Sequence, residues 1–361
     1  MATLTEASIA SRKGIRYTIY AIICLIIARG LILTGIGIYK KIFPAPPTPP
    51  TVAFGKLTKL PFPERQKVNL SFSLETPEGS LPTFSDQAKV YFMPKLASNL
   101  LSLDFAQDKA NRLGFNIDPQ QTTESLYRFF HKTSPSTLET NIVTGSFSLS
   151  YDLNVDPAPL SVKPPLPEIA RNSIKTFLSG AGLYPKDLET GKFESKYLKT
   201  QSGGFIPANS LSDANLIRID LFRSDYDSLP VVTQTTGEGN VWFMVSGIKE
   251  RGKEVIAGEY YYFPVDETQV ATYPIKTADS VWQEFTSGNY YTASTGTTAE
   301  GDAIKIRKIY LAYYDAGKYT EFFQPVFVFV GDKDFVGYIP AVTSDYYGEW
   351  NEPQALLTVY K

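Results

Sequence analysis

The side chains that carry nucleophilic, acid–base and metal chemistry are scarce in this chain. Among 361 residues there is one cysteine, Cys24, and one histidine, His131. Zinc sites of the Cys/His type therefore cannot form within one chain, and a Ser-His-Asp triad would have to use His131. That histidine ends the aromatic run Leu126-Tyr-Arg-Phe-Phe-His131, which is typical of a strand. We expect it to be a half-exposed strand residue without a catalytic role.

Two short motifs have the spacing of known sites but lack the required context. Ser246-Gly-Ile-Lys249 matches the S-x-x-K pattern of penicillin-binding enzymes, yet it ends a strand where that chemistry needs a helix N-terminus. Asp152-x-Asn154-x-Asp156 begins like a calcium loop, but Pro157 replaces the required glycine and Lys163 occupies the twelfth position. Neither phosphate-binding glycine motif is present. We predict no metal and no cofactor.

A pair of carboxylates, as in glycosidases, is the remaining catalytic option. Candidates such as Glu284 and Asp315 follow no spacing rule that the sequence can test, and solvated surface carboxylates are the default. The sequence therefore predicts a protein that is not an enzyme. The alternatives are a carboxylate enzyme acting on cell-wall polymer and a glycan-binding or structural surface protein.

Aromatic side chains are abundant, with 23 tyrosines and 23 phenylalanines. Core filling explains many of them, since aromatics favour strands. Clustered tyrosines alternate across strands, however, so half of each cluster should face outward, where tyrosine suits contact with proteins and glycans. We expect a partner-binding surface that includes Tyr260, Tyr262, Tyr313, Tyr314, Tyr346, Tyr347 and Trp350.

One long apolar segment, residues 17–41, lies near the N-terminus. A membrane-spanning helix needs about 20 predominantly apolar residues. The apolar region exceeds that of a cleaved signal peptide, and no small-x-small cleavage site follows it. We therefore predict an uncleaved signal anchor in the lipid bilayer. The flanking basic residues, Arg12, Lys13 and Arg16 before the apolar run and Lys40 and Lys41 at its end, give only a small asymmetry. Because the rest of the chain lacks cysteine, which suits a location outside the cytosol, we expect a cytoplasmic N-terminus and an extracellular or periplasmic C-terminal part.

Arg29 lies near the middle of this apolar segment. An ionisable residue at membrane depth usually has an acidic partner or faces a polar cavity. The segment contains no Asp or Glu, so a partner would come from another membrane protein. The alternative is that the long Arg29 side chain reaches the membrane surface.

The remaining sequence is that of an ordinary globular protein. Its net charge is −2 and it has no basic cluster, which argues against nucleic-acid binding. Period-2 alternation predicts strands at 68–74, 88–93, 126–131, 138–144, 147–151, 216–222, 241–245, 255–263, 304–314, 325–330 and 335–342. Helical spacing predicts helices at 98–113 and 167–178, and a third that Thr277 caps and Gly288 ends. Because strands come in runs, the predicted class is α+β, with antiparallel sheets that carry packed helices.

Composition divides the chain into five predicted parts. They are a cytoplasmic tail (1–16), the transmembrane anchor (17–41), a Pro-rich spacer (42–62), an N-terminal α+β ectodomain (63–160) and a C-terminal α+β ectodomain (161–361).

The last third of the chain resembles a known family. The residues that carry the resemblance are Tyr273-Pro-Ile-Lys-Thr277, Ser280-Val-Trp-Gln-Glu-Phe285, Ile309-Tyr-Leu-Ala-Tyr-Tyr314 and Gln324-Pro-Val-Phe-Val-Phe329. Their order is similar to the C-terminal domain of the YycH/YycI regulatory proteins and related PepSY-like modules, over about residues 254–342. The resemblance implies a single-span protein whose ectodomain regulates a membrane histidine kinase through binding. We therefore expect a non-catalytic, extracytoplasmic regulatory or protein-interaction module.

Overall fold

The computed structural model describes residues 4–42, 49–65, 68–95, 102–201 and 204–348. The chain divides into two compact units between Pro49 and Pro50. The first unit holds α1, and the second holds the sheets and the remaining described helices.

Helix α1 (Leu4–Ile42) contains 39 residues and is therefore roughly 58 Å long. Its stretch Arg16–Ile36 is long and apolar enough to cross a membrane, and none of it is buried within the protein. The helix also includes most of the predicted N-terminal tail, because no proline interrupts the chain before Pro44.

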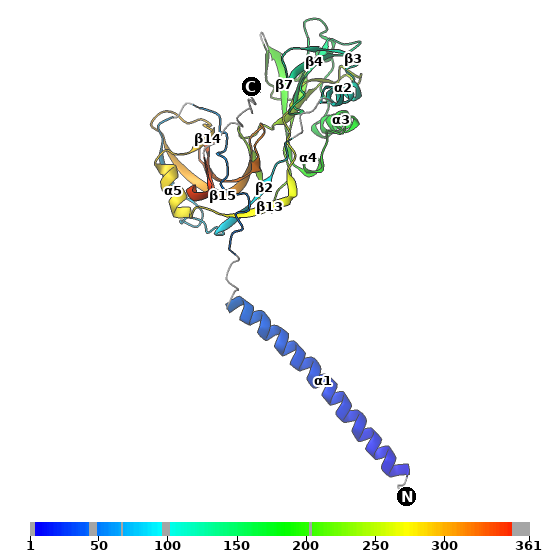
Figure 1. Cartoon of the computed structure of the whole chain (residues 1–361), viewed down its shortest axis with the longest axis vertical. Coiled ribbons are helices and arrows are strands. Elements are labelled where there is room, and N and C mark those ends of the chain that lie inside the picture. The colour runs from blue at the N-terminus through cyan, green and yellow to red at the C-terminus, as the bar shows by residue number, and fades with distance from the viewer. Residues whose placement is uncertain (1–3, 43–48, 66–67, 96–101, 202–203, 349–361) are drawn as a thin grey trace, which may run out of the picture. The chain divides into compact units, whose positions relative to one another are not determined.

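The second unit is mixed α and β, dominated by sheet, as predicted (Figure 1). Its described helices are α2 (Ser102–Leu113), α3 (Pro167–Gly180), α4 (Lys186–Thr190) and α5 (Ala278–Thr286). Single 3-10 turns lie at Ala158–Leu160 and Ser344–Tyr346.

The described strands form three sheets. The large sheet is antiparallel and has the order β3 (Ile117–Gln121), β4 (Leu126–Phe130), β5 (Ser136–Asn141), β6 (Phe147–Tyr151), β12 (Val255–Tyr260), β11 (Val241–Val245), β9 (Leu216–Leu221), β7 (Phe193–Gln201), β8 (Gly204–Pro207). The C-terminal sheet has the order β1 (Ser71–Leu74), β15 (Ala303–Asp315), β17 (Pro325–Gly331), β18 (Val336–Pro340), β14 (Tyr291–Ser294), with β10 (Val231–Thr233) also on β15. The small sheet is β13 (Asp266–Pro274), β2 (Gln87–Phe92), β16 (Phe322–Phe323). β1 and β10 pair with β15 in parallel, unlike the predicted antiparallel arrangement.

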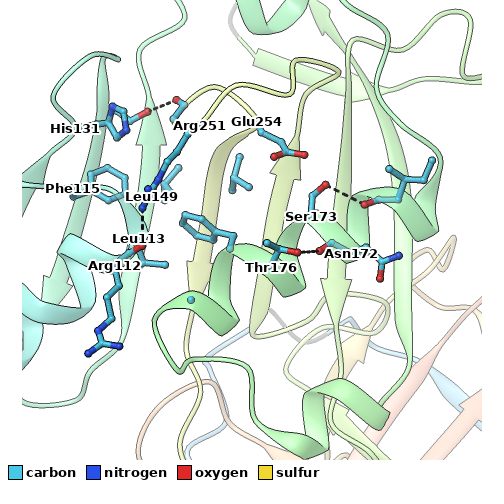
Figure 2. Close-up of a pocket in the computed structure, with 16 residues that line it drawn as sticks. Arg112, Leu113, Phe115, His131, Leu149, Asn172, Ser173, Thr176, Arg251 and Glu254 are labelled. Carbon is cyan, nitrogen blue, oxygen red and sulfur yellow. Dashed lines mark hydrogen bonds between the residues drawn. The ribbon is translucent and has the colours of Figure 1, made fainter.

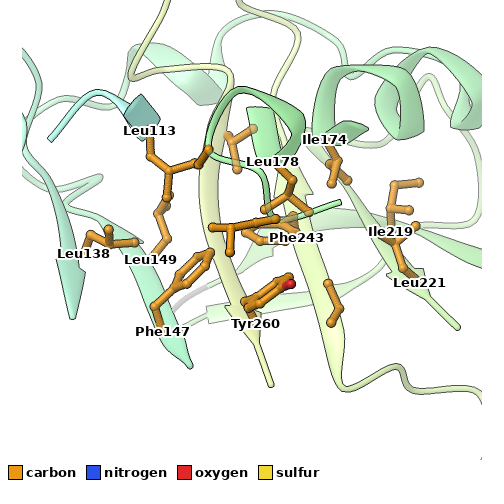
Figure 3. Packing of buried hydrophobic residues seen from close by; sticks show 14 of the residues in the cluster. Leu113, Leu138, Phe147, Leu149, Ile174, Leu178, Ile219, Leu221, Phe243 and Tyr260 are labelled. Carbon is orange, nitrogen blue, oxygen red and sulfur yellow. The ribbon is translucent and has the colours of Figure 1, made fainter. Parts of the chain in front are cut away.

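The main core lies between the large sheet and the helices α2 and α3 (Figure 3). Helix α3 buries Ala170, Ile174 and Leu178, which recur every four residues on one face. The large sheet contributes every second side chain of its strands to this core, among them the fully buried Phe243 of β11. This packing fixes α3 against the sheet.

A second core lies where α5 packs on the C-terminal sheet. Thr277 caps the helix as predicted, since its Oγ1 accepts a hydrogen bond from the Ser280 backbone N–H at 3.3 Å. The buried Phe285 stacks on Phe329 of β17 with ring centroids 4.0 Å apart.

The sheets cross the predicted domain boundary between residues 160 and 161. β6 lies before that boundary and pairs with β12 beyond it. In the same way β1 pairs with β15, with Ser71 opposite Ala303. The folded unit also begins earlier than the predicted residue 63, because the Val52 N–H donates to Thr272 and Leu57 is fully buried.

A buried ion cluster joins the large sheet to the C-terminal sheet. Arg223 is 4% exposed, and its Nε lies 2.7 Å from Asp315 at the end of β15. One terminal nitrogen lies 2.8 Å from Asp187 of α4, and the other donates to the Phe263 carbonyl at 2.6 Å. Every arm of the guanidinium is thus paired, as a buried charge requires.

Candidate functional site

The strongest candidate site is a cleft of about 580 Å³ over the helical face of the large sheet (Figure 2). It lies between the C-terminal end of α2, helix α3 and the turn that joins β11 to β12. Its volume falls within the range of small-molecule sites, roughly 300–1,000 Å³.

The floor of the cleft is apolar. It is formed by Leu113, Phe115, Leu149 and Val255, all of which are buried in the core beneath. The partly exposed Phe177 and Ile169 of α3 form one wall. Polar and charged side chains surround this apolar floor, and placed polar groups around an apolar surface are typical of a ligand site.

His131 stands at one end of the cleft in a narrow slot. Gly114 and Gly252, which both have positive φ, flank its ring, and a Cβ on Gly252 would lie 2.6 Å from His131 Cε1. A side chain at Gly252 would thus collide with the ring, so glycine is required there for steric as well as conformational reasons. Phe115 contacts the imidazole edge-on.

The hydrogen bonds of His131 fix its tautomer. Nδ1 accepts from the Ser134 backbone N–H at 3.2 Å and lies 2.8 Å from Ser134 Oγ. Because a backbone N–H can only donate, the neutral ring carries its proton on Nε2. Burial, with a smaller contribution from the Arg251 charge, lowers the pKa of His131. The neutral form is therefore favoured.

The contact between Ser134 and His131 does not have the arrangement of a catalytic dyad. Ser134 is buried, its hydroxyl belongs to a local turn, and no carboxylate hydrogen bond to Nε2 occurs among the described residues. A triad needs a third group that orients the base. His131 is half-buried, as predicted, but it lies just beyond β4 and not within the strand.

Two charged side chains face the cleft from the β11–β12 turn. Arg251 extends towards the end of α2 and donates to the Arg112 carbonyl at 3.0 Å. Glu254 points towards α3, opposite Ser173. The Ser173 hydroxyl donates to Ile169 within its own helix, so it is already satisfied.

The two carboxylates named as candidates for a catalytic pair lie outside the cleft, and both are ion-paired. Glu284 is 2.7 Å from Lys276, and Asp315 is 2.7 Å from Arg223. The two belong to separate clusters. Within the described residues, no group of three or more His, Cys, Asp or Glu side chains is placed to hold a metal ion.

The structure corrects the expected tyrosine surface at three positions. Tyr260, Tyr313 and Tyr314 are at most 4% exposed, so their rings cannot contact a partner. Tyr313 and Tyr314 both face inward because their sheet is covered on both faces, which period-2 alternation alone does not reveal. Tyr260 belongs to the core between the large sheet and its helices.

The other predicted contact residues are distributed differently. Tyr262 is half-buried and its hydroxyl donates to Asp187 at 2.9 Å. Tyr346 and Tyr347 are also half-buried, and Tyr347 accepts from the Leu60 N–H. Arg29 is exposed on α1 and does not belong to the segments that line the cleft. Trp350 lies outside the described residues.

Sequence reasoning missed the cleft because its lining comes from segments between Arg112 and Val255 that share no spacing rule. Its strongest local signal was the segment containing Arg251, Gly252 and Glu254, which the predicted strands at 241–245 and 255–263 leave as a connection.

No family model matches the chain, and no curated protein matches it. Among solved structures, the chain is similar to an uncharacterized protein from Eubacterium rectale. The identity is 13%, the alignment covers 79% of this chain and 91% of that chain, and the TM-score is 0.37. A likeness this low carries no inference about fold or function.

Proposed function

We propose that this chain is a single-pass, membrane-anchored and non-catalytic binding module of the cell surface, with a regulatory role. The observation that carries the proposal is the preformed cleft between α2, α3 and the β11–β12 turn. Apolar helix α1 supports membrane attachment. The resemblance of residues 254–342 to YycH/YycI-type proteins favours regulation of a membrane partner.

The chemistry of the cleft supports binding over catalysis. Glycoside hydrolysis uses two carboxyl groups that flank the scissile bond. Among the described residues that line the cleft, Glu254 is the single carboxylate. The glycosidase alternative therefore has less support than a binding role.

The test is thermal unfolding of the full chain in detergent, with and without the small-molecule fraction of a bacterial culture. A ligand that binds the folded state raises the Tm by mass action. Ser173→Trp, which fills the cleft, should lose that increase. Ser179→Trp, on the exposed part of the same helix outside the cleft, is the matched control. An equal increase in all three proteins, or none in the wild type, overturns the binding role.

Orientation has a separate test. Protease added to intact cells should remove the second unit while a cytoplasmic marker stays intact. Complete protection of residues 50–348 would place the unit inside the cell.

A further inference from the structure

Groups of opposite charge lie at different sides of the cleft, and this arrangement indicates the class of ligand. Donors lie at the α2 end and a carboxylate lies at the α3 side (Figure 2). The apolar floor occupies the space between them. The inference below rests on the proposed binding function of this cleft.

The donor end consists of Arg251 and His131. Arg251 uses one terminal nitrogen for the Arg112 carbonyl, whereas a guanidinium has five N–H groups in all. Its Nε is close to Gly114, beside the His131 ring. His131 adds an Nε2–H donor, because its Nδ1 is occupied as an acceptor. Two such donors suit a carboxylate.

The acceptor side consists of Glu254. Among the described residues its carboxylate has no hydrogen bond and no ion pair, although Lys253 beside it pairs with Asp156 at 3.3 Å. The exposed Asn172 amide lines the same side. An unpaired carboxylate at the edge of a cavity favours a cationic group such as an ammonium.

The two charged groups of the turn face different elements, because Arg251 reaches the end of α2 and Glu254 points towards α3 (Figure 2). In a free amino acid the ammonium and the carboxylate are bonded to one carbon atom, so a ligand whose charged groups are farther apart matches this arrangement better. A peptide separates its termini by about 3.3 Å for each added residue. Its side chains would then lie over Leu113, Phe115 and Phe177.

We propose that the cleft binds a short linear peptide with apolar side chains and two free termini. The peptide carboxylate contacts Arg251 and His131, and its ammonium contacts Glu254. Apolar side chains cover the floor, where their transfer from water supplies most of the affinity.

The experiment uses calorimetric titration of the full chain in detergent. The probes are tripeptides built from every combination of Ala, Val, Leu and Phe. The tightest binder is then tested as its N-acetyl and C-amide forms, which each lack one terminal charge. A charge-assisted hydrogen bond predicts a loss of about tenfold to a hundredfold for each modification.

Variants assign each end. With Glu254→Gln, N-acetylation should no longer weaken binding, and with Arg251→Gln, C-amidation should have less effect than in the wild type. Glu250→Gln and Lys249→Gln, in the same turn but outside the cleft lining, should behave like the wild type. A distorted turn would weaken binding of all peptides alike, so it cannot make one variant insensitive to the modification of one peptide end.

The outcomes separate this inference from the proposed function. If culture extract stabilises the protein through the cleft but no tripeptide binds, the peptide class is wrong and the binding role stands. If the blocked peptides bind as tightly as the free one, the assignment of the two ends is wrong. If free leucine binds as tightly as the best tripeptide, the ligand is an amino acid instead.

Discussion

Arg223 links the large sheet to the C-terminal sheet through buried ion pairs. Its guanidinium pairs with Asp187 and Asp315 and lies 4.1 Å from the centre of the Tyr262 ring. Tyr226 and Tyr262 both donate to Asp187. Burial, reinforced by the Asp187 charge, raises the pKa of both tyrosines, so their hydroxyls remain protonated donors.

Arg223→Ala should destabilise the fold strongly, because it leaves two carboxylates without their cation in a buried site. Loss of one partner of a buried pair costs about 3–5 kcal/mol. The control is Lys175→Ala, whose pair with Glu189 at 2.5 Å joins side chains that are 45% and 49% exposed. Such a surface pair is worth at most about 1 kcal/mol. Denaturant unfolding measures both, and equal losses would contradict a structural role for the cluster.

His131 predicts a pH dependence of stability. Burial and Arg251 lower its pKa in the folded state, whereas the unfolded value is about 6.5. Between these two values the unfolded chain binds more protons, so stability falls as pH decreases through about 6.5 towards the folded pKa. Protonation would also end the acceptor role of Nδ1 towards Ser134.

The measurement compares the free energy of unfolding at several pH values for wild type and His131→Gln. The wild type should lose more stability than the variant on acidification, and the two profiles should become parallel above pH 7.5. Arg251→Gln should weaken the effect by removing the second cause. Parallel profiles throughout the acid range would show that His131 titrates normally.

At the scale of elements, α5 depends on its N-cap. Thr277→Ala removes the acceptor for the Ser280 N–H and should cost about 1 kcal/mol of stability. Ser280→Ala changes an exposed hydroxyl but keeps the capped backbone N–H, so it should have a smaller effect. Thermal unfolding distinguishes them, and an equal effect of both would exclude capping as the cause.

Elements with strong periodicity could be predicted from the sequence, and those imposed by their neighbours could not. β6 occupies the predicted residues 147–151, because Phe147, Leu149 and Tyr151 alternate with two serines. β3, with the sequence IDPQQ, has neither alternation nor favourable residue types. It is a strand because β4 beside it supplies hydrogen-bond partners.

The same limit applied to the candidate site. The predicted strands at 241–245 and 255–263 located the connection between β11 and β12, but not that Arg251 reaches α2 while Glu254 faces α3. Those positions depend on how α2 and α3 pack on the sheet.

At the scale of the whole molecule, strand pairing joins distant parts of the sequence. Alternation tells which face of a strand is buried, but not which strand pairs with it. β1 and β15 pair although Phe72 and Ile304 are far apart in the chain. β6 and β12 also pair across a long stretch of sequence. A domain boundary placed by composition at residue 160 therefore separates strands that pair with each other in the folded protein.

Helix α1 carries one residue that its apolar composition does not explain. Arg29 lies within the apolar stretch Arg16–Ile36, where a central arginine opposes insertion by about 2.5–3.5 kcal/mol. A role in binding a second membrane protein would account for that unfavourable contribution.

Arg29→Leu should then keep the chain in the membrane fraction but abolish recovery of the partner after cross-linking in intact membranes. Thr34→Leu is the matched control, because its hydroxyl already donates to the Gly30 carbonyl within the helix. Recovery of the same partners by wild type and by both variants would mean that Arg29 reaches the membrane surface, and that assembly depends on the second unit alone.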